Sequence, residues 1–437
     1  MLSGWRFRAE LTGDQLLLAQ TTADACRVVY NTGLQQRRAY RKRGSSIGYA
    51  QQCKELTKAK AEHTWLREAP AVCLQQALRD LDRNCAQHGT WKVDWRSQRR
   101  WEPSLRFADP KQIKVERLNH RGARVWLNCF GWVRFRLSKG RDIAAVTLRS
   151  VTLRLEHGRW QVSLLVEDGR STPACHELAG TAVGIDRGVT VAVATSDGDL
   201  HDRAFVTPTE TRRAKRLARQ ISRRAKGSVN RGKAKEKYAR LRATEAHRRE
   251  DFVKQLACVV TEANELVVLE DLRTHNMTRR PKPRADPADP GKFLPNGRAS
   301  KAGLNQAILG KGWSLFELAL TSAARRTGSA VVKVCAAYTS QRCPECGWVD
   351  PKSRESQAVF RCVHCLHYGH ADIGAARNIL AAGLADRLNA CGGDPPPSGS
   401  GYAMKQEPAG NREELLLCVV QYGTESPRLS CGEDDVK

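Results

Sequence analysis

Three acidic residues stand where apolar segments of the chain begin or end. Asp186 closes the segment Val183–Asp186, Glu270 closes Leu266–Glu270, and Asp372 opens a helix-like segment further on. If the two apolar segments are neighbouring strands, and the later helix packs beside them, the three carboxylates converge on one point. Carboxylates at close range repel one another, which raises their pKa values unless divalent cations lie among them.

Such a cluster would select its metal through the chemistry of its oxygen ligands. Oxygen donors favour Mg²⁺ or Mn²⁺ over Zn²⁺. Two such ions about 3.5–4 Å apart can activate a water molecule and stabilise the leaving oxygen of a phosphodiester. The spacing is therefore compatible with a metal-dependent nuclease. A single acid at the end of a strand is usually a cap or a surface residue, and it is the presence of three in one basic chain that favours a site.

Four of the fifteen cysteines form two C-x-x-C pairs, which is the pattern of a metal site. Cys343 and Cys346 make the first pair, Cys362 and Cys365 make the second, and fifteen residues lie between the pairs. This separation predicts a tetrahedral Zn²⁺ site in which each pair forms one turn and presents two sulfurs. Because four thiolates fill the coordination sphere, we expect the zinc to be structural. The remaining cysteines lack partners in the sequence and are expected to be buried apolar residues.

Positive charge is the strongest feature of the composition. The 437 residues include 73 Lys and Arg against 46 Asp and Glu, which gives a net charge of +27. This balance predicts an anionic partner and argues against an enzyme for small neutral metabolites. Apolar residues make up 41% of the chain, so it can still bury a core.

No apolar run approaches the ~20 residues that a membrane-spanning helix needs. The first residues also lack the apolar region of a secretory signal. We therefore expect reduced thiols in a cytosol-like compartment, with metal binding as the reason for close cysteine pairs.

The densest positive charge lies between residues 210 and 250. This segment holds 16 Lys or Arg and 4 Asp or Glu, so its net charge is 16 − 4 = +12, and its pattern predicts one helical stretch. Cations at this density repel one another strongly without a polyanion, which favours nucleic-acid binding. A solvated charged helix is the alternative.

In the first half of the chain, the spacing of apolar residues changes near residue 90 from a helical to a strand period. A strand over Trp5–Leu11 is followed by helices that end near Gly89, and Thr12 is the predicted cap of the first helix. From about Trp91 to Glu167, apolar residues alternate with basic or polar ones, which predicts a small antiparallel sheet or barrel with a hairpin at His157. The alternating arginines form either a solvated face or a face that follows phosphates.

The second half, from about Gly180, has an α/β character. The run Leu266–Leu269 predicts a buried strand, Pro281–Gly297 a loop, and Trp313–Arg326 a helix. The stretch beyond Gly383 is rich in Pro, Gly and Ser and predicts a disordered tail.

Three motifs occur in a fixed order, with the cysteine pairs just before the third. They are GIDRG at Gly184–Gly188, LEDL at Leu269–Leu272, and DIGAARNI at Asp372–Ile379, with TSQRC at Thr339–Cys343 opening the zinc ribbon. This order resembles that of the TnpB family, the transposon-encoded RNA-guided endonucleases related to type V CRISPR effectors. Further similar segments extend the resemblance over nearly the whole chain: Cys26–Asn31, Tyr49–Gln51, Leu74–Leu78 and Asn389–Gly393.

The resemblance implies an α+β multidomain fold. An RNase H-like (RuvC) α/β nuclease domain would contain the inserted zinc ribbon, and a wedge-like β-barrel would contain an inserted helical recognition lobe. The implied boundaries are 1–11 and 91–178 for the barrel, 12–90 for the recognition lobe, 179–337 and 369–385 for the nuclease, 338–368 for the ribbon, and 386–437 for a disordered tail.

The roles of the family's residues carry over position by position. Asp186, Glu270 and Asp372 would be the catalytic ligands of Mg²⁺ or Mn²⁺, and the four paired cysteines would hold structural Zn²⁺. By resemblance, Tyr49 and Gln75 lie where relatives read a short DNA motif beside the target, although both could equally be packing residues. The guide RNA and its heteroduplex would be bound by Arg212, Arg213, Arg216, Arg223, Arg224, Lys226, Lys233 and Lys235.

The function that the resemblance implies is an RNA-guided DNA endonuclease of a mobile element, with a guide RNA and double-stranded DNA as partners. Guide pairing would supply the specificity, while the protein reads a short flanking motif. A compact type V CRISPR effector and a nuclease-inactive RNA-guided repressor are the alternatives, and the intact set of acids counts against the second. We expect a monomer or weak dimer in the prokaryotic cytoplasm, at the nucleoid and away from membranes.

Overall fold

The computed structural model describes residues 1–98, 101–138, 140–287, 289 and 291–390. Its contacts divide the chain into two units, Met1–Leu384 and Ala385–Lys437. The tail predicted for 386–437 lies outside the described residues from 391 onward. Among the described residues, none of the helices combines the length and the apolar character that a membrane span requires.

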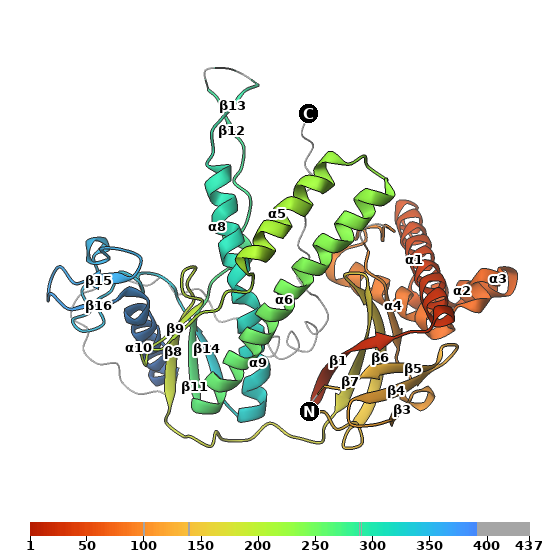
Figure 1. Ribbon diagram of the computed structural model, residues 1–437, viewed down its shortest axis with the longest axis horizontal. Helices are drawn as coiled ribbons and strands as arrows, with labels where there is room; N and C mark the ends of the chain where they lie inside the picture. Colours follow the sequence, from red (N-terminus) through yellow and green to blue (C-terminus); the bar gives the residue numbers. More distant parts are fainter. Residues whose placement is uncertain (99–100, 139, 288, 290, 391–437) are drawn as a thin grey trace. The chain divides into compact units, whose positions relative to one another are not determined.

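The N-terminal part is built on a seven-stranded antiparallel sheet (Figure 1). Its strands are β1 (Leu2–Glu10), β2 (Ser104–Phe107), β3 (Lys114–Arg117), β4 (Gly122–Leu127), β5 (Gly131–Arg136), β6 (Thr147–Glu156) and β7 (Arg159–Glu167). Their order is β2-β6-β7-β1-β5-β4-β3. The hairpin predicted at His157 is confirmed, because β6 and β7 pair across it.

The prediction of a closed barrel is wrong, since the edge strands β2 and β3 do not pair with each other in the described residues. They are joined by the 3₁₀ turn η1 (Pro110–Gln112), which begins at a proline that has no N–H to donate. Both strands are also only four residues long, too short to extend a ladder around the open side.

Four helices are inserted between β1 and β2: α1 (Gly13–Lys42), α2 (Tyr49–Glu62), α3 (Thr64–Glu68) and α4 (Ala71–His88). The cap predicted at Thr12 is confirmed, because its side chain accepts from the Gln15 N–H at 3.3 Å while the Gln15 side chain accepts from the Thr12 N–H at 3.2 Å. Helix and sheet residues, among them Leu34, Leu74 and Phe135, form one hydrophobic core.

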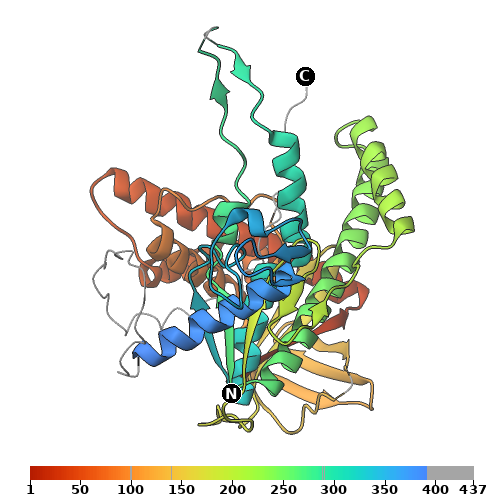
Figure 2. The same ribbon diagram turned by 90° about the vertical axis from the view of Figure 1, so that its left-hand side faces the viewer.

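A second, five-stranded sheet carries the acidic residues. Its strands, in spatial order, are β10 (Leu200–His201), β9 (Val193–Thr195), β8 (Ala182–Asp186), β11 (Leu266–Glu270) and β14 (Ala330–Val334). β8, β11 and β14 run parallel. One face is covered by α6 (Val229–Ala263) and α9 (Trp313–Thr327), and the other by α10 (Ala371–Ala390), drawn in blue in Figure 2.

The prediction of one basic helix is wrong, because the 210–250 segment forms a helical hairpin. Its two helices are α5 (Pro208–Arg223) and the first half of α6, which Figure 1 shows side by side. Gly227 takes a positive φ of 92°, and Ser228 then caps α6 by accepting from the Arg231 N–H at 3.3 Å. The regular charge pattern hid this break.

Short elements complete the described fold: α7 (Thr274–Met277), β12 (Arg284–Ala285), β13 (Phe293–Leu294), α8 (Arg298–Lys311), η2 (Pro351–Ser353), β15 (Val359–Arg361) and β16 (Tyr368–His370). Where the sequence predicts a loop over Pro281–Gly297, β12 and β13 form a short hairpin, visible beyond α8 in Figure 1.

The helix α10 lies directly against the sheet because β8 carries a glycine there. A Cβ atom on Gly184 would stand 2.1 Å from the Ala376 carbonyl oxygen and 2.7 Å from the Leu380 nitrogen. No real Cβ tolerates such distances to backbone atoms, so only glycine allows this approach. The contact fixes the position of α10, and therefore of its first turn.

We predict that Gly184→Ala lowers the free energy of unfolding by about 1–3 kcal/mol, because the added methyl group overpacks the contact between β8 and α10. Urea denaturation measures this change. Gly232→Ala in α6 is the matched control, since a Cβ there meets nothing within 4 Å, and its stability should be unchanged or slightly higher. Equal stabilities of the two variants would contradict the close approach.

Candidate active site

Strand alternation places two of the three acids on the same face of the five-stranded sheet. Leu269 pairs in register with Ile185, so Glu270 and Asp186 come next on adjacent parallel strands. Val267 and Leu269 pack towards α6 and α9, whereas Leu266 and Val268 pack towards α10. Because side chains alternate between faces, both acids lie on the α10 side.

The third acid, Asp372, is in the first turn of α10 and approaches the other two from the same side of the sheet. Asp372 and Glu270 are only 6% and 8% exposed. Burial, followed by the charges of Glu270 and Asp372, raises the pKa of Asp186 to about 7. Burial also raises the pKa of Glu270. The three carboxylates are thus near enough for the charges of Glu270 and Asp372 to act on Asp186, and their role as metal ligands stays a prediction.

Neighbouring polar groups hold these carboxylates in place. The Thr339 hydroxyl donates to Oε1 of Glu270, and the buried Asn378 amide donates to the Thr339 carbonyl at 2.9 Å. The Asp372 N–H donates to Nδ1 of His370 at 3.2 Å. Thr339 and Asn378 belong to motifs that the sequence singles out, but nothing in the sequence assigned them these contacts.

A cation from the ribbon, Arg354, already occupies the acidic site. Its Nη2 lies 3.1 Å from Oδ1 of Asp372 and also donates to the Gln357 carbonyl at 2.9 Å. The Arg354 charge acts to lower the pKa of Asp186, against the larger effect of burial. No pattern in the sequence marks Arg354, because it lies between the cysteine pairs in a stretch without periodicity.

A second arginine, Arg187, supports Glu270 from the opposite face of the sheet. Its side chain is 1% exposed and lies 3.2 Å from Glu317 of α9. Its other terminal nitrogen donates to the backbone carbonyl of Glu270. Glu317 in turn pairs with Lys333 of β14. The arginine in the GIDRG motif thus ties β8, β11, β14 and α9 together directly behind the acids.

The three carboxylates could hold a divalent cation, since Glu270 and Asp372 are buried, Asp186 is half-buried beside them, and all three offer only oxygen donors. Their oxygens are not all within 4.8 Å of one another; among the described residues only the cysteine cluster meets that limit. The arginine beside Asp372 shows that this environment binds positive charge.

The four paired cysteines do come together, as the sequence predicts. Sγ of Cys343 lies 3.6 Å from Sγ of Cys365, and Sγ of Cys346 lies 3.6 Å from Sγ of Cys362. Zn–S bonds of about 2.3 Å in a tetrahedron place sulfurs about 3.8 Å apart, so the observed spacing fits Zn²⁺. Burial acts to raise the pKa of the Cys362 thiol, but the N–H groups of Cys365 and His364 and the neighbouring cysteine side chains together lower this pKa to about 6. The pKa values of Cys343 and Cys365 are raised instead, so the cluster without metal favours one thiolate.

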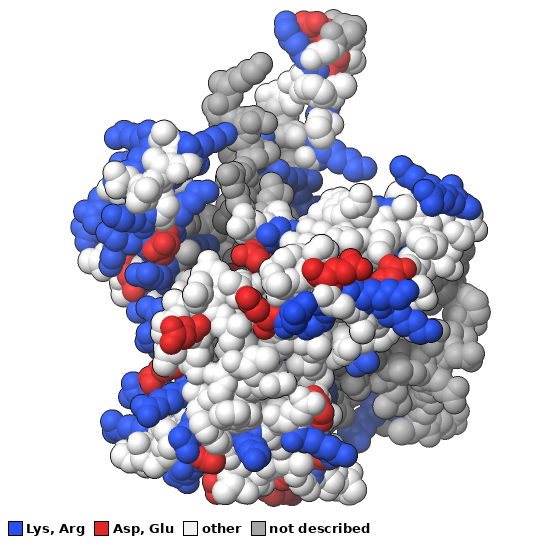
Figure 3. Space-filling view, turned by 90° about the vertical axis from the view of Figure 1, so that its right-hand side faces the viewer, with Lys and Arg blue, Asp and Glu red and all other residues white. Residues whose placement is uncertain are grey.

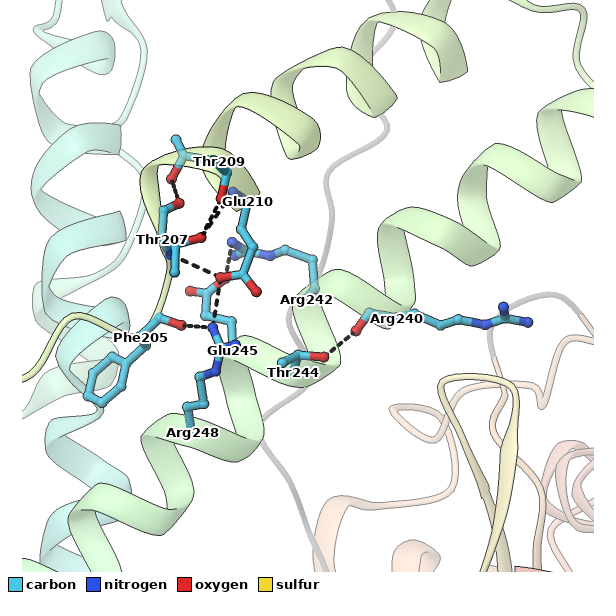
Figure 4. Close-up of polar contacts among 10 residues, drawn as sticks. Phe205, Thr207, Thr209, Glu210, Arg240, Arg242, Thr244, Glu245 and Arg248 are labelled. Atoms are coloured by element: carbon cyan, nitrogen blue, oxygen red, sulfur yellow. Dashed lines mark hydrogen bonds and ion pairs between the residues drawn. The ribbon is translucent and has the colours of Figure 1, made fainter.

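The base of the α5–α6 hairpin uses its acids internally (Figure 4). Arg248 of α6 lies 2.7 Å from Glu210 of α5 and donates to the Phe205 carbonyl at 3.0 Å. The Arg248 hydrogen bond, with backbone support from Thr207, lowers the pKa of Glu210 to about 2. Glu245 pairs with both Arg242 and Arg249. The Arg248–Glu210 pair joins the two helices, whereas the Glu245 pairs lie within α6.

The cations of the hairpin remain largely free. Within the described part of the chain no side-chain partner is found for Arg212, Arg213, Arg216, Arg223, Lys226 and Lys233, and all six are exposed. Arg224 instead donates to the Asn230 carbonyl at 2.6 Å. Lys235 is exposed and has an interaction partner. Figure 3 shows Lys and Arg gathered on this projecting hairpin, at the left of the view.

Tyr49 and Gln75 lie on neighbouring helices. Tyr49 is the first residue of α2, and its ring lies 5.2 Å beneath the guanidinium of Arg79 in α4. Gln75 is exposed one turn before Arg79. The two predicted DNA-reading residues therefore flank one arginine, and Tyr49 also has a packing role.

Three family models match the chain. One described as "Probable transposase" covers residues 163–280, one described as "Cas12f1-like, TNB domain" covers 313–379, and one described as "Helix-turn-helix domain" covers 1–46. In the structure the last range holds β1 and the single long helix α1 rather than two short helices.

Two relatives match nearly end to end. "Putative RNA-guided DNA endonuclease InsQ" of Escherichia coli (strain K12) is 33% identical over 410 residues, which are 93% of this chain and 97% of that protein. "Putative RNA-guided DNA endonuclease" of Streptomyces pristinaespiralis is 33% identical over 404 residues, 89% of this chain and 90% of that protein.

A solved structure shares the fold. It is titled "Cryo-EM structure of the Cas12f1-sgRNA-target DNA complex", and it aligns with a TM-score of 0.53 at 11% identity, over 87% of this chain and 98% of that one. The multidomain α+β architecture expected from the sequence is therefore confirmed.

We predict that Cys362→Ser sharply reduces the zinc that copurifies with the chain, because one of four thiolate ligands is lost. Elemental analysis of the purified protein measures the zinc content. Cys335→Ser is the matched control, since this exposed cysteine lies outside the cluster. The assignment fails if both variants retain the zinc of the parent chain.

The raised pKa of Asp186 predicts a pH dependence of stability without divalent cations. Because the pKa rises from 3.8 to about 7 on folding, the folded chain holds this proton more tightly than the unfolded chain. The stability that this proton provides is present below about pH 4 and is lost as the pH rises towards 7.

Asp186→Asn removes this titration, so at pH 8 without divalent cations the variant should be more stable than the parent by about 2–4 kcal/mol. Denaturant unfolding at pH 5 and 8 measures the difference. If the free energies of unfolding of parent and variant changed equally between pH 5 and pH 8, the pKa of Asp186 would not be raised.

Proposed function

This chain belongs to the TnpB family of RNA-guided DNA endonucleases, and from that premise we propose that it cuts DNA at the Asp186–Glu270–Asp372 cluster. The observation that carries the proposal is the placement of these acids on the α10 side of the sheet, with Glu270 and Asp372 buried and Asp186 half-buried. A basic chain that places its acids at one point is suited to a polyanionic substrate held beside a cation.

In this proposal the RuvC-like nuclease spans 179–337 and 369–385, and its three carboxylates hold Mg²⁺ or Mn²⁺. The bound cation supplies Lewis acidity towards the scissile phosphate and a water of lowered pKa. Thr339 keeps the Glu270 carboxylate oriented through its hydroxyl. Arg187 holds the Glu270 backbone from behind, so the donors are fixed before any ligand arrives.

Arg354 gives the ribbon a direct part in the site. Its guanidinium pairs with Asp372 and carries the donors that suit a phosphate oxygen. We infer that Arg354 neutralises Asp372 when the site is empty and contacts the DNA phosphate when substrate is bound. The ribbon at 338–368, held by structural zinc, would thus position one residue of the active site.

The α5–α6 hairpin is the proposed holder of the guide RNA and its heteroduplex with DNA. Its acids are engaged at the base, whereas Arg212, Arg213, Arg216, Arg223, Lys226 and Lys233 are exposed and have no side-chain partner among the described residues. Such cations neutralise phosphates without reading sequence. We assign recognition of the short flanking DNA motif to Tyr49 and Gln75. Both belong to the helical recognition lobe at 12–90, which is inserted into the strand domain made of 1–11 and 91–178.

A mobile-element endonuclease is favoured over a compact CRISPR effector. The relatives named as RNA-guided endonucleases match nearly the whole chain, whereas a relative named Cas12f1 matches 15% of it. The intact acidic cluster argues against a nuclease-inactive repressor. We place the activity in the prokaryotic cytoplasm, at the nucleoid where the DNA lies.

We predict that Asp186→Ala abolishes DNA cleavage while RNA and DNA binding persist, because the substitution removes one metal donor and leaves the basic surfaces unchanged. Gel assays with the copurified RNA, a matching DNA target and Mg²⁺ measure cleavage, and mobility shifts measure binding.

Asp271→Ala is the matched control, since Asp271 is the adjacent acid and is exposed; this variant should still cut. Undiminished cutting by Asp186→Ala would sink the assignment of the site. Loss of binding together with cutting would show instead that the residue supports the fold.

A further inference from the structure

The loop between α4 and β2 presents two tryptophans to solvent. Trp91 is 55% exposed and Trp95 is 47% exposed. Large aromatic rings bury much apolar surface when they have a partner, so a neighbouring pair left half in water indicates a surface that receives a ligand.

The backbone that carries these rings is held rigidly from α1. The guanidinium of Arg38 donates to the Val93 carbonyl at 2.7 Å and to the Trp91 carbonyl at 3.4 Å. Asn31 and Arg96 exchange two hydrogen bonds, at 2.9 and 3.0 Å, through the Asn31 amide and the Arg96 backbone. Val93 is buried between these clamps. The rings are therefore presented at a fixed place instead of on a loose loop.

The same arginine also faces the rings. The Arg38 guanidinium carbon lies 4.9 Å from the Trp95 ring centroid and 5.9 Å from that of Trp91. The guanidinium covers part of both rings, and a planar group can stack on the ring surface that stays exposed. Tryptophans that only packed into a core would not need a guanidinium over their rings.

Free positive charge borders the rings. Arg38 is followed by Arg41, Lys42 and Arg43 at the end of α1, and these three are exposed and lack a side-chain partner in the described residues. Lys92 is exposed between the tryptophans, and Asp94 is the one acid from Gly89 to Gln98. Flat rings beside unpaired cations match a ligand that is both planar and anionic.

We propose that Trp91, Trp95 and Arg38 form a stacking platform for unpaired bases of the guide RNA, with Arg41, Lys42 and Arg43 on the adjoining phosphates. Single-stranded RNA is recognised by splayed bases that stack on aromatic rings and guanidinium planes. A platform that is fixed before binding loses little conformational freedom when RNA binds, which suits a guide RNA that stays bound to the protein. The inference rests on the proposed function, which supplies the RNA.

The test uses the full chain and a short single-stranded oligoadenylate RNA that carries 2-aminopurine, whose fluorescence falls when it stacks. The double variant Trp91→Ala, Trp95→Ala should lose the quenching and bind at least about fivefold more weakly, since one stacked base is worth about 1–3 kcal/mol. The dependence of affinity on salt should stay the same, because no charge is removed.

Three further variants sharpen the result. Trp91→Phe with Trp95→Phe keeps the rings and should restore binding, which also answers any failure of the alanine variant to fold. Removing the charges of Arg41, Lys42 and Arg43 together should reduce the salt slope by about 2. Trp65→Ala is the matched control, because Trp65 is 46% exposed on α3, and it should bind like the parent.

The proposal is overturned by unchanged quenching in the alanine variant, by an equal loss in Trp65→Ala, or by an effect confined to single-stranded DNA of the same sequence. It is also overturned if only the oligomeric state changes in sedimentation, which would mark a protein interface. If the parent chain carries its copurified RNA but the alanine variant binds equally well, the platform fails while the proposed function stands. If no RNA accompanies the parent, the proposed function itself fails.

Discussion

The gathering of three carboxylates on one side of a sheet, two buried and Asp186 half-buried, is the constraint on which the C-terminal half of the structure depends. Charges removed from water are costly unless cations or hydrogen bonds replace the solvent. The chain meets this requirement from several directions: Thr339 donates to Glu270, Arg354 pairs with Asp372, and Arg187 supports the strand end from behind. A divalent cation at the same place would complete the compensation.

This constraint explains why distant segments are joined. α10 can bring Asp372 to the sheet only because Gly184 lets the helix touch β8. The helix begins directly after the ribbon strand β16, so the position of its first turn follows from the ribbon that the four cysteines hold together. The cysteine cluster and the geometry of the acids are therefore linked through one short piece of chain.

The sequence predicts the features that depend on local chemistry. The cysteine spacing predicts the cluster, the apolar runs predict the strands that end in Asp186 and Glu270, and Thr12 marks the start of α1. It does not predict features that arise from tertiary contacts. Arg354 and Arg187 carry no periodic signal, the break at Gly227 lies within an unbroken charge pattern, and barrel closure depends on edge strands whose lengths the alternation does not fix.

The central claim is that an RNA carried by this chain chooses the DNA that is cut. In the most direct test, the chain is expressed together with the DNA that flanks its gene, and the copurified RNA is sequenced. The segment of that RNA that pairs with the target is then replaced. The account predicts that Mg²⁺-dependent cleavage moves to DNA that matches the new segment and stops at the old one. Cleavage that ignores the replacement, or the lack of any discrete RNA, would contradict it.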